Sequence, residues 1–219
     1  MFFISTGYLD VRVLMSNGIQ VSIRMTNNPK LIDIVDKIKL NIPPEVIFDE
    51  SNAATLIEHK DLLLAKGPGM VDAFYATLMN YEKTKEIFKE GELPDRMRDF
   101  LAWWERSIQG PFDNSYWEWQ AFVGVIHVQR GVTNAMMLSM WGWLQNYIEQ
   151  AITDEVDSSV RLAICQSLRK LASTAQAYAA DSFMETYVNG VMRATGFKRV
   201  LLDRMVHTEI DDIVKDHRD

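Results

Sequence analysis

The chain has 219 residues, 47% of them hydrophobic, and carries 23 Lys and Arg against 30 Asp and Glu for a net charge of -7. No basic cluster offers a surface for phosphate backbones, so the composition argues against a nucleic-acid partner. No apolar run approaches the roughly 18 to 20 residues of a membrane span, and the N-terminus lacks a basic signal segment. The single Cys165 cannot form an internal disulfide. We therefore expect a soluble cytoplasmic protein without a membrane partner.

Residues 8–26 predict a β-hairpin, because apolar and polar residues alternate on both sides of a Ser16-Asn17-Gly18 segment. A two-residue turn at Asn17-Gly18 would place apolar residues opposite polar ones, whereas a three-residue loop keeps one face apolar. With the longer loop the apolar pairs are Met15 with Ile19, Val13 with Val21 and Val11 with Ile23. We assign residues 1–28 to this appendage, whose apolar face must lie on the helical body or on a second subunit, since an isolated hairpin is marginal in water.

After Asn28-Pro29, which is a helix-start signal, the pattern is helical to the end and predicts an all-α body. Gly and Pro residues separate the helices, and Gly67-Pro68-Gly69 divides the second from the third. The expected helices cover residues 29–40, 50–66, 69–80, 82–90, 93–109, 113–129, 133–151, 157–195 and 199–216. We expect one domain over residues 29–198 and a helical tail over residues 199–219.

His127 is the most informative single residue. It follows Phe122-Val-Gly-Val-Ile near the end of the expected helix 113–129, on or beside the apolar face, and Gly131 ends that helix. A neutral imidazole on an apolar helix face is what a haem iron needs as its proximal ligand. A hydrogen-bonded core histidine is the alternative interpretation.

Three segments extend this observation, and they occur in a fixed order. They are Val71-Asp-Ala-Phe-Tyr-Ala-Thr-Leu78, Tyr81-Glu-Lys-Thr-Lys-Glu-Ile-Phe88 and Val123-Gly-Val-Ile-His-Val-Gln-Arg-Gly-Val132. With them, the chain from about residue 52 to 196 resembles the sensor-globin family, which holds protoglobins and the globin domains of globin-coupled sensors. Two features depart from the family pattern: Gln129 stands where the family often has Arg, followed by Arg130, and the N-terminal hairpin has no counterpart.

The resemblance implies a globin fold with extra N-terminal helices and a haem b cofactor whose iron is ligated by His127. The expected ligand is a diatomic gas (O2, CO or NO), bound for sensing or transport, with Tyr75 as a distal hydrogen-bond donor. A core tyrosine held by a backbone carbonyl is the alternative for Tyr75. The residues expected to contact the cofactor are His127, Tyr75, Phe74, Phe100, Leu101, Trp104, Val123, Met137 and Trp141, although aromatic residues at helical spacing also suit plain core packing.

Two other functions stay open. The first is a haem enzyme acting on NO, nitrite or peroxide, which would need an external reductant for sustained turnover. The second is a haem-free sensor globin that serves as a signalling interaction module. The sequence contains no cyclase, kinase or methyl-accepting module, so a sensor would signal through a partner protein.

The helices at 133–151 and 157–195, the last two long globin helices, predict a homodimer, because they carry more apolar surface than a monomer usually exposes. In the longer helix the apolar residues repeat at spacings of three and four, as a helical bundle requires. The residues assigned to this interface are Ile164, Leu168, Leu171, Ala175 and Tyr178, the small residues Ala172, Ala179 and Ala180, and Trp143 and Tyr147 of the shorter helix.

Overall fold

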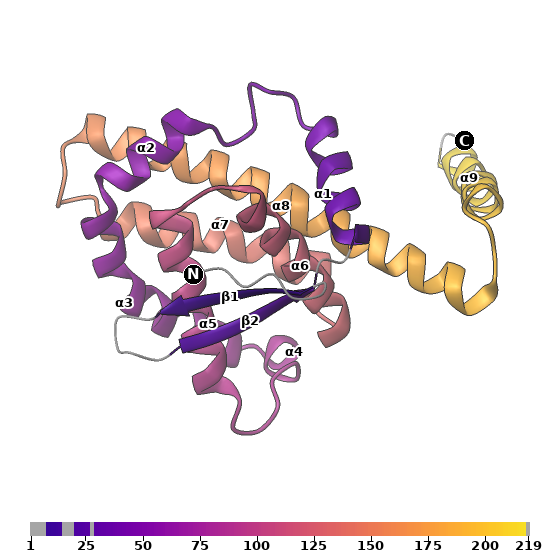
Figure 1. Ribbon diagram of the computed structural model, residues 1–219, viewed down its shortest axis with the longest axis horizontal. Helices are drawn as coiled ribbons and strands as arrows, with labels where there is room; N and C mark the ends of the chain where they lie inside the picture. The colour runs from indigo at the N-terminus through magenta and orange to yellow at the C-terminus, as the bar shows by residue number, and fades with distance from the viewer. Residues whose placement is uncertain (1–7, 15–19, 27–28, 218–219) are drawn as a thin grey trace.

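The structure, a computed structural model, describes residues 8–14, 20–26 and 29–217, with side chains from residue 33 onward. Figure 1 shows a helical body from which one helix stands apart. The elements are β1 (Tyr8–Leu14), β2 (Gln20–Thr26), α1 (Pro29–Asn41), α2 (Glu50–Glu58), α3 (Lys60–Met79), α4 (Glu82–Lys85), α5 (Leu93–Gln109), α6 (Asn114–Arg130), α7 (Asn134–Ala151), α8 (Ser158–Thr195) and α9 (Arg199–Asp216). The all-α body expected from the sequence is confirmed.

The strands β1 and β2 pair antiparallel, with Val13 opposite Val21 and Val11 opposite Ile23. These are the pairs that a three-residue loop gives. The expected Met15–Ile19 pair lies outside the described residues.

The helix α8 is the longest element of the body and has 38 residues, about 57 Å at 1.5 Å per residue. It packs against α6 along one side and against α1, α2 and α7 elsewhere, while α3 packs on α5 and α7. The largest fully buried side chains include Trp104, Tyr116 and Tyr178. The core therefore lies between the α3–α5 pair and the α6–α8 pair.

The break expected at Gly67-Pro68-Gly69 is wrong. The chain breaks instead at His59, and α3 continues through all three residues. Pro68 lies on the exposed side of α3, where water can reach the carbonyl that its missing N–H leaves free.

Tertiary packing explains why helix continues through these glycines. A Cβ at Gly67 would lie 3.0 Å from side-chain atoms of Leu101 and Trp104, and a Cβ at Gly69 would lie 3.0 Å from the hydroxyl of Tyr147. The glycines let α3 approach α5 and α7 closely, and that burial offsets the low helix propensity of the segment.

The expected helix 82–90 is also shorter in the structure, where α4 has one turn. The Thr84 hydroxyl donates to the carbonyls of Leu78 and Tyr81, which ties the turn back to the end of α3. The chain then leaves the helix so that Ile87 and Phe88 line an internal cavity.

The apolar residues of α8 that we assigned to a dimer interface are wrong for that role. Ile164, Leu168, Leu171, Ala175 and Tyr178 are at most 4% exposed within one chain, because they pack against α2, α6 and α7. On α7, Trp143 and Tyr147 stack on each other at 5.3 Å, and both pack on the buried core. Both side chains are therefore partly buried within one chain.

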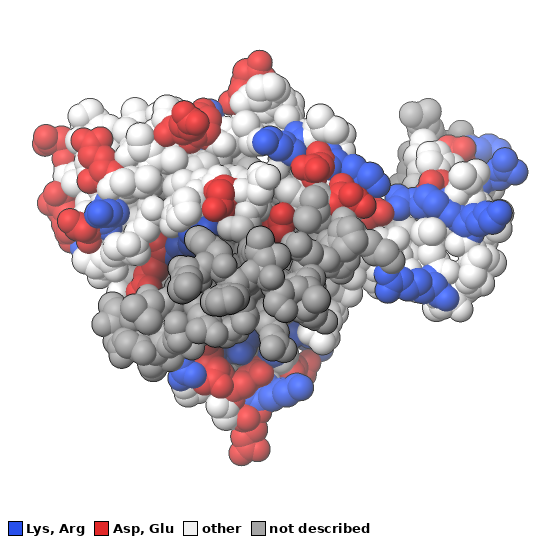
Figure 2. Space-filling model, viewed as in Figure 1, with Lys and Arg blue, Asp and Glu red and all other residues white. Residues whose placement is uncertain are grey.

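No helix in the described ranges is long and apolar enough to cross a membrane. On the face of the body that Figure 2 shows, acidic and basic side chains are interspersed outside the grey residues.

Candidate functional site

A cavity of about 980 Å³ lies between α5 and α6. Residues of α3 and of the α4–α5 connection close one end, and α7 and a residue of α8, Ala179, complete the wall. Most of the lining is aromatic, aliphatic or Met. A cavity of this size and composition suits a large, flat, mainly apolar ligand.

His127 lines this cavity from the last turn of α6. The helix ends just after it, since Gly131 adopts a left-handed conformation (φ 71°) and Val132 donates its N–H to the His127 carbonyl at 3.0 Å. The backbone at His127 is therefore fixed by the helix cap.

The imidazole of His127 is not held in the same way. Its Nδ1 is buried and has no hydrogen-bond partner in the described part of the chain. Burial lowers the pKa of His127, and this effect exceeds the opposite effect of the Val123 carbonyl one turn earlier. Burial favours the neutral imidazole, and its buried Nδ1 has no partner among the described residues, so a hydrogen-bonded core histidine accounts poorly for this side chain.

Tyr75 lies at the other side of the cavity and is 8% exposed. Its hydroxyl donates to the backbone carbonyl of Arg96 at 2.9 Å, and burial raises the pKa of the phenol. This is the arrangement of the core-tyrosine alternative. A ligand that accepts a hydrogen bond from Tyr75 must compete with the Arg96 carbonyl.

The wall residues expected from the sequence fall into two groups. Phe74, Phe100, Val123, Met137 and Trp141 line the cavity. Phe74 and Phe100 are in contact, with ring centroids 4.4 Å apart.

Leu101 and Trp104 do not line the cavity, although the sequence analysis placed them on its wall. Both pack against Gly67 of α3, and the Trp104 indole donates to the Leu63 carbonyl at 3.0 Å. The apolar stripe of α5 faces α3, and the cavity-facing positions lie on the adjacent side of the helix.

Sequence reasoning missed two residues that line the cavity, Trp103 on that side of α5 and Gln120 on α6. Trp103 stacks on Phe100 at 5.5 Å, and its indole donates to Gln120 Oε1 at 3.3 Å. Because the indole N–H only donates, the amide oxygen of Gln120 faces Trp103 and its Nε2 is left buried without a partner among the described residues. Gln120 precedes His127 by two helical turns, and that spacing was the available signal.

The departure from the family pattern concerns Gln129 and Arg130, and the structure places the two side chains differently. Gln129 is exposed, whereas Arg130 lines the cavity and forms an ion pair with Glu92, and its guanidinium also donates to the Ile87 carbonyl at 3.1 Å. The pair lowers the pKa of Glu92. These contacts join the end of α6 to the α4–α5 connection one turn after His127.

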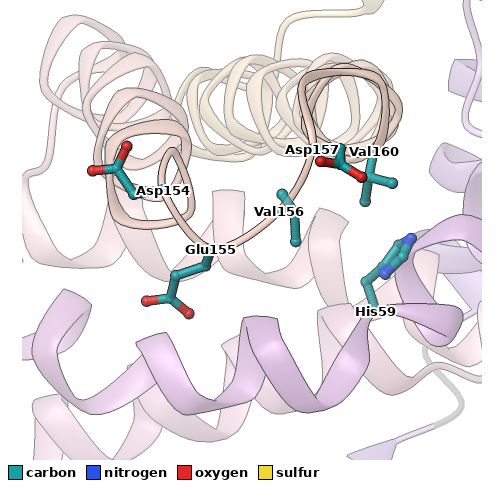
Figure 3. Close-up of a pocket in the computed structure, with 6 residues that line it drawn as sticks. All are labelled: His59, Asp154, Glu155, Val156, Asp157 and Val160. Carbon is teal, nitrogen blue, oxygen red and sulfur yellow. The ribbon is translucent and has the colours of Figure 1, made fainter.

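A second, open crevice of about 480 Å³ lies where His59 meets the α7–α8 connection. Figure 3 shows that the carboxylates of Asp154, Glu155 and Asp157 do not converge on one point. Glu155 forms an ion pair with Lys66. No group of three or more His, Cys, Asp or Glu in the described residues could hold a metal ion, so this crevice is not a metal centre.

The protoglobin family model matches residues 46–189, which is most of the chain and includes the whole cavity. The chain belongs to the protoglobin family. Its fold is similar to the globin domain of a Geobacter sulfurreducens globin-coupled sensor, with a TM-score of 0.58 and 19% identity over 69% of this chain and 95% of that chain. It is also similar to the globin domain of E. coli DosC in a ferric form, with a TM-score of 0.52 and 12% identity over 69% of this chain and 98% of that one. No curated protein matches.

The predicted globin fold is therefore confirmed, and membership of the family implies a haem globin. The hairpin, all of α1, the last residues of α8 and all of α9 lie outside the matched residues.

Proposed function

We propose that this protoglobin holds haem b through His127 and reversibly binds a diatomic gas, for sensing or transport. The observation that carries the proposal is the half-buried imidazole on the wall of a large apolar cavity, whose buried Nδ1 has no hydrogen-bond partner among the described residues. A lone pair that no hydrogen bond uses is what a metal ligand must offer.

The donor set fits haem iron better than other metals. One imidazole in an apolar cavity cannot hold a free Zn²⁺ ion, which takes four ligands. Haem supplies an iron with four of its own ligands and an open position for a gas. The aromatic pairs Phe74–Phe100 and Trp103–Trp141 would flank a flat ring system and keep water away from it.

The chain's own residues have distinct roles in this proposal. Burial lowers the pKa of His127, which favours the neutral imidazole, and the cap at Gly131 fixes its backbone. Tyr75 can donate to a polar gas ligand only by giving up its hydrogen bond to the Arg96 carbonyl. The net gain from that donor is therefore expected at the lower end of the usual range, about 0.5 kcal/mol.

The proposal extends to location and partners. Cys165 is the single cysteine, and it is buried, which fits the reducing cytoplasm. Relatives that are globin domains of sensors support a signalling partner protein. The expected homodimer remains part of the proposal, although most of the α8 residues first assigned to its interface are buried within one chain.

An absorption spectrum tests the haem assignment. The protein reconstituted with haemin should show a Soret band, and His127→Ala should lose haem because the imidazole is its only protein ligand. Adding free imidazole to His127→Ala should restore the band, since the cavity then holds the ligand without its tether. His59→Ala is the matched control, because this imidazole lies in the other crevice.

Three outcomes would count against the proposal. An unchanged spectrum for His127→Ala would assign the iron to another ligand. No Soret band in the reconstituted wild type would favour the haem-free interaction module. Turnover of NO, nitrite or peroxide with an added reductant would favour the enzyme.

A further inference from the structure

Two arginines line the mainly apolar cavity on the side of Tyr75. Arg96 comes from α5, and its backbone carbonyl accepts the Tyr75 hydroxyl at 2.9 Å. Arg130 comes from the end of α6, one turn after His127. Burial raises the pKa of Tyr75, and the charges of both guanidinium groups oppose this, so both lie within electrostatic reach of the phenol. A purely apolar ligand would give no reason to place two positive charges at one end of its cavity.

The guanidinium of Arg96 is only partly used. Its Nη2 lies 2.9 Å from Asp99 Oδ2, whereas its Nε is buried and has no hydrogen-bond partner among the described residues. The Asp99 side chain is 59% exposed, so this ion pair within α5 is weak. Arg96 can therefore turn to a stronger acceptor in the cavity, and its buried Nε would gain a partner there.

The guanidinium of Arg130, by contrast, is held by Glu92. Both of its Nη atoms donate to the Glu92 carboxylate, Nη1 at 3.2 Å, and the two side chains are only 22% and 18% exposed. The hydrogen bond from Arg130 lowers the pKa of Glu92 most, and the charge of Arg96 acts in the same direction. This end of the cavity thus already binds one carboxylate, which the chain itself supplies.

The third arginine of the cavity lining, Arg106, does not belong to this group. Its Nη1 donates to the Gly110 carbonyl at 3.0 Å, and its Nη2 lies 3.4 Å from Asp113. These partners belong to the corner between α5 and α6, so Arg106 serves that corner. The positive charge that remains for a ligand is that of Arg96 and Arg130.

We propose that Arg96 and Arg130 bind a carboxylate of the ligand in the cavity, and that Glu92 competes with that carboxylate for Arg130. The inference rests on the proposed function, because it takes a tetrapyrrole with propionate side chains as the ligand. Carboxylates are the acceptors that a guanidinium fork binds best. Glu92 lies in the connection between α4 and α5, so binding of the carboxylate loosens the contact that joins this connection to the end of α6.

Two probes without iron separate this contact from iron ligation. They are metal-free protoporphyrin IX, which has two carboxylates, and its dimethyl ester, which has the same ring and no charge. Trp103 and Trp141 line the cavity, so quenching of tryptophan fluorescence measures the Kd of each probe. The wild type should bind the acid at least about tenfold more tightly than the ester, because charged hydrogen bonds form only with the acid.

The variants should act in opposite directions on the acid. Arg96→Gln and Arg130→Gln should each weaken its binding about tenfold. Glu92→Gln should tighten it about threefold, because Arg130 keeps its charge while its competitor loses one. None of the three should change the Kd of the ester by more than about twofold. Arg169→Gln and Glu149→Gln are the matched controls and should leave both Kd values unchanged, since this ion pair does not line the cavity.

Tighter binding of the acid by Glu92→Gln supports the competition, since loss of a merely structural contact would weaken both probes. Four outcomes would overturn the proposal: no binding of either probe, equal Kd values for acid and ester, equal losses of both probes in the two arginine variants, or weaker acid binding by Glu92→Gln. These outcomes do not depend on His127, because neither probe carries iron. An unchanged Soret band in His127→Ala would contradict the proposed function alone.

Discussion

Gly124→Ala should destabilise the protein, because α6 and α8 cross most closely at this residue. A Cβ at Gly124 would lie 2.9 Å from the Ala179 carbonyl carbon and closer still to the Ala179 oxygen and Ser182 Oγ. Ordinary contacts begin at 3.4 Å. The nearest backbone atom, the Ala179 oxygen, requires a separation of more than 1 Å, and the fully buried Ser182 hydroxyl, which donates to the Ala121 carbonyl, must move as well.

The expected loss follows from three contributions. Overpacking against backbone costs up to about 3 kcal/mol, and weakening the buried Ser182 hydrogen bond costs about 1 kcal/mol. Alanine regains about 1 kcal/mol over glycine through helix propensity. The net loss is about 3 kcal/mol, which lowers Tm by roughly 6 to 12 °C in a chain of this size.

Thermal unfolding followed by circular dichroism measures this loss. Gly142→Ala is the matched control, since Gly142 is also helical and a Cβ there meets no atom within 4 Å. Gly142→Ala should raise Tm by about 2 °C through propensity alone. If Gly124→Ala were as stable as Gly142→Ala, the close crossing of α6 and α8 would be refuted.

Two further predictions concern the cavity. Tyr75→Phe should speed O2 dissociation about twofold and CO dissociation less, because bound CO is the weaker hydrogen-bond acceptor. Stopped-flow measurements of both dissociation rates test this. Equal changes for the two gases would indicate a purely structural tyrosine. In the haem-free protein, the free energy of unfolding should fall as the pH drops below about 6.5, since His127 takes up a proton in the unfolded chain before it does so in the folded one. His127→Gln should flatten this dependence between pH 5.5 and 7.5 in urea titrations, and an unchanged slope would contradict the burial argument.

The helix ends were the most predictable part of the fold. Gly131 and Gly196 end α6 and α8 with positive φ angles of 71° and 74°, a conformation that glycine adopts without strain. Gly67 looks the same in the sequence but lies inside α3. Its role is set by Leu101 and Trp104, which are distant in the chain, so local reasoning could not separate a helix break from a close contact.

The prediction of the cavity-lining residues meets the same limit of local sequence reasoning. His127 and Phe100 could be placed on the cavity because motif order and helical period locate them to within one face of a helix. The period does not distinguish Trp103 from Trp104, which are adjacent and point to different neighbours. Trp103 faces the cavity, and Trp104 faces α3. Which side of α5 meets the cavity depends on how α3 packs, and this is a tertiary property.

The length of α8 has a mechanical consequence. This unbroken helix lines the cavity with Ala179, which lies at the crossing with Gly124 of α6. Gly124 precedes His127 by about one helical turn. Beyond Ala179, α8 continues to Thr195 before α9 begins. Over those 16 residues, about 24 Å, a tilt of about 5° at the crossing displaces the far end by about 2 Å. A change in the tilt of α8 at the cavity wall would therefore be largest, on this side of the crossing, where α9 begins.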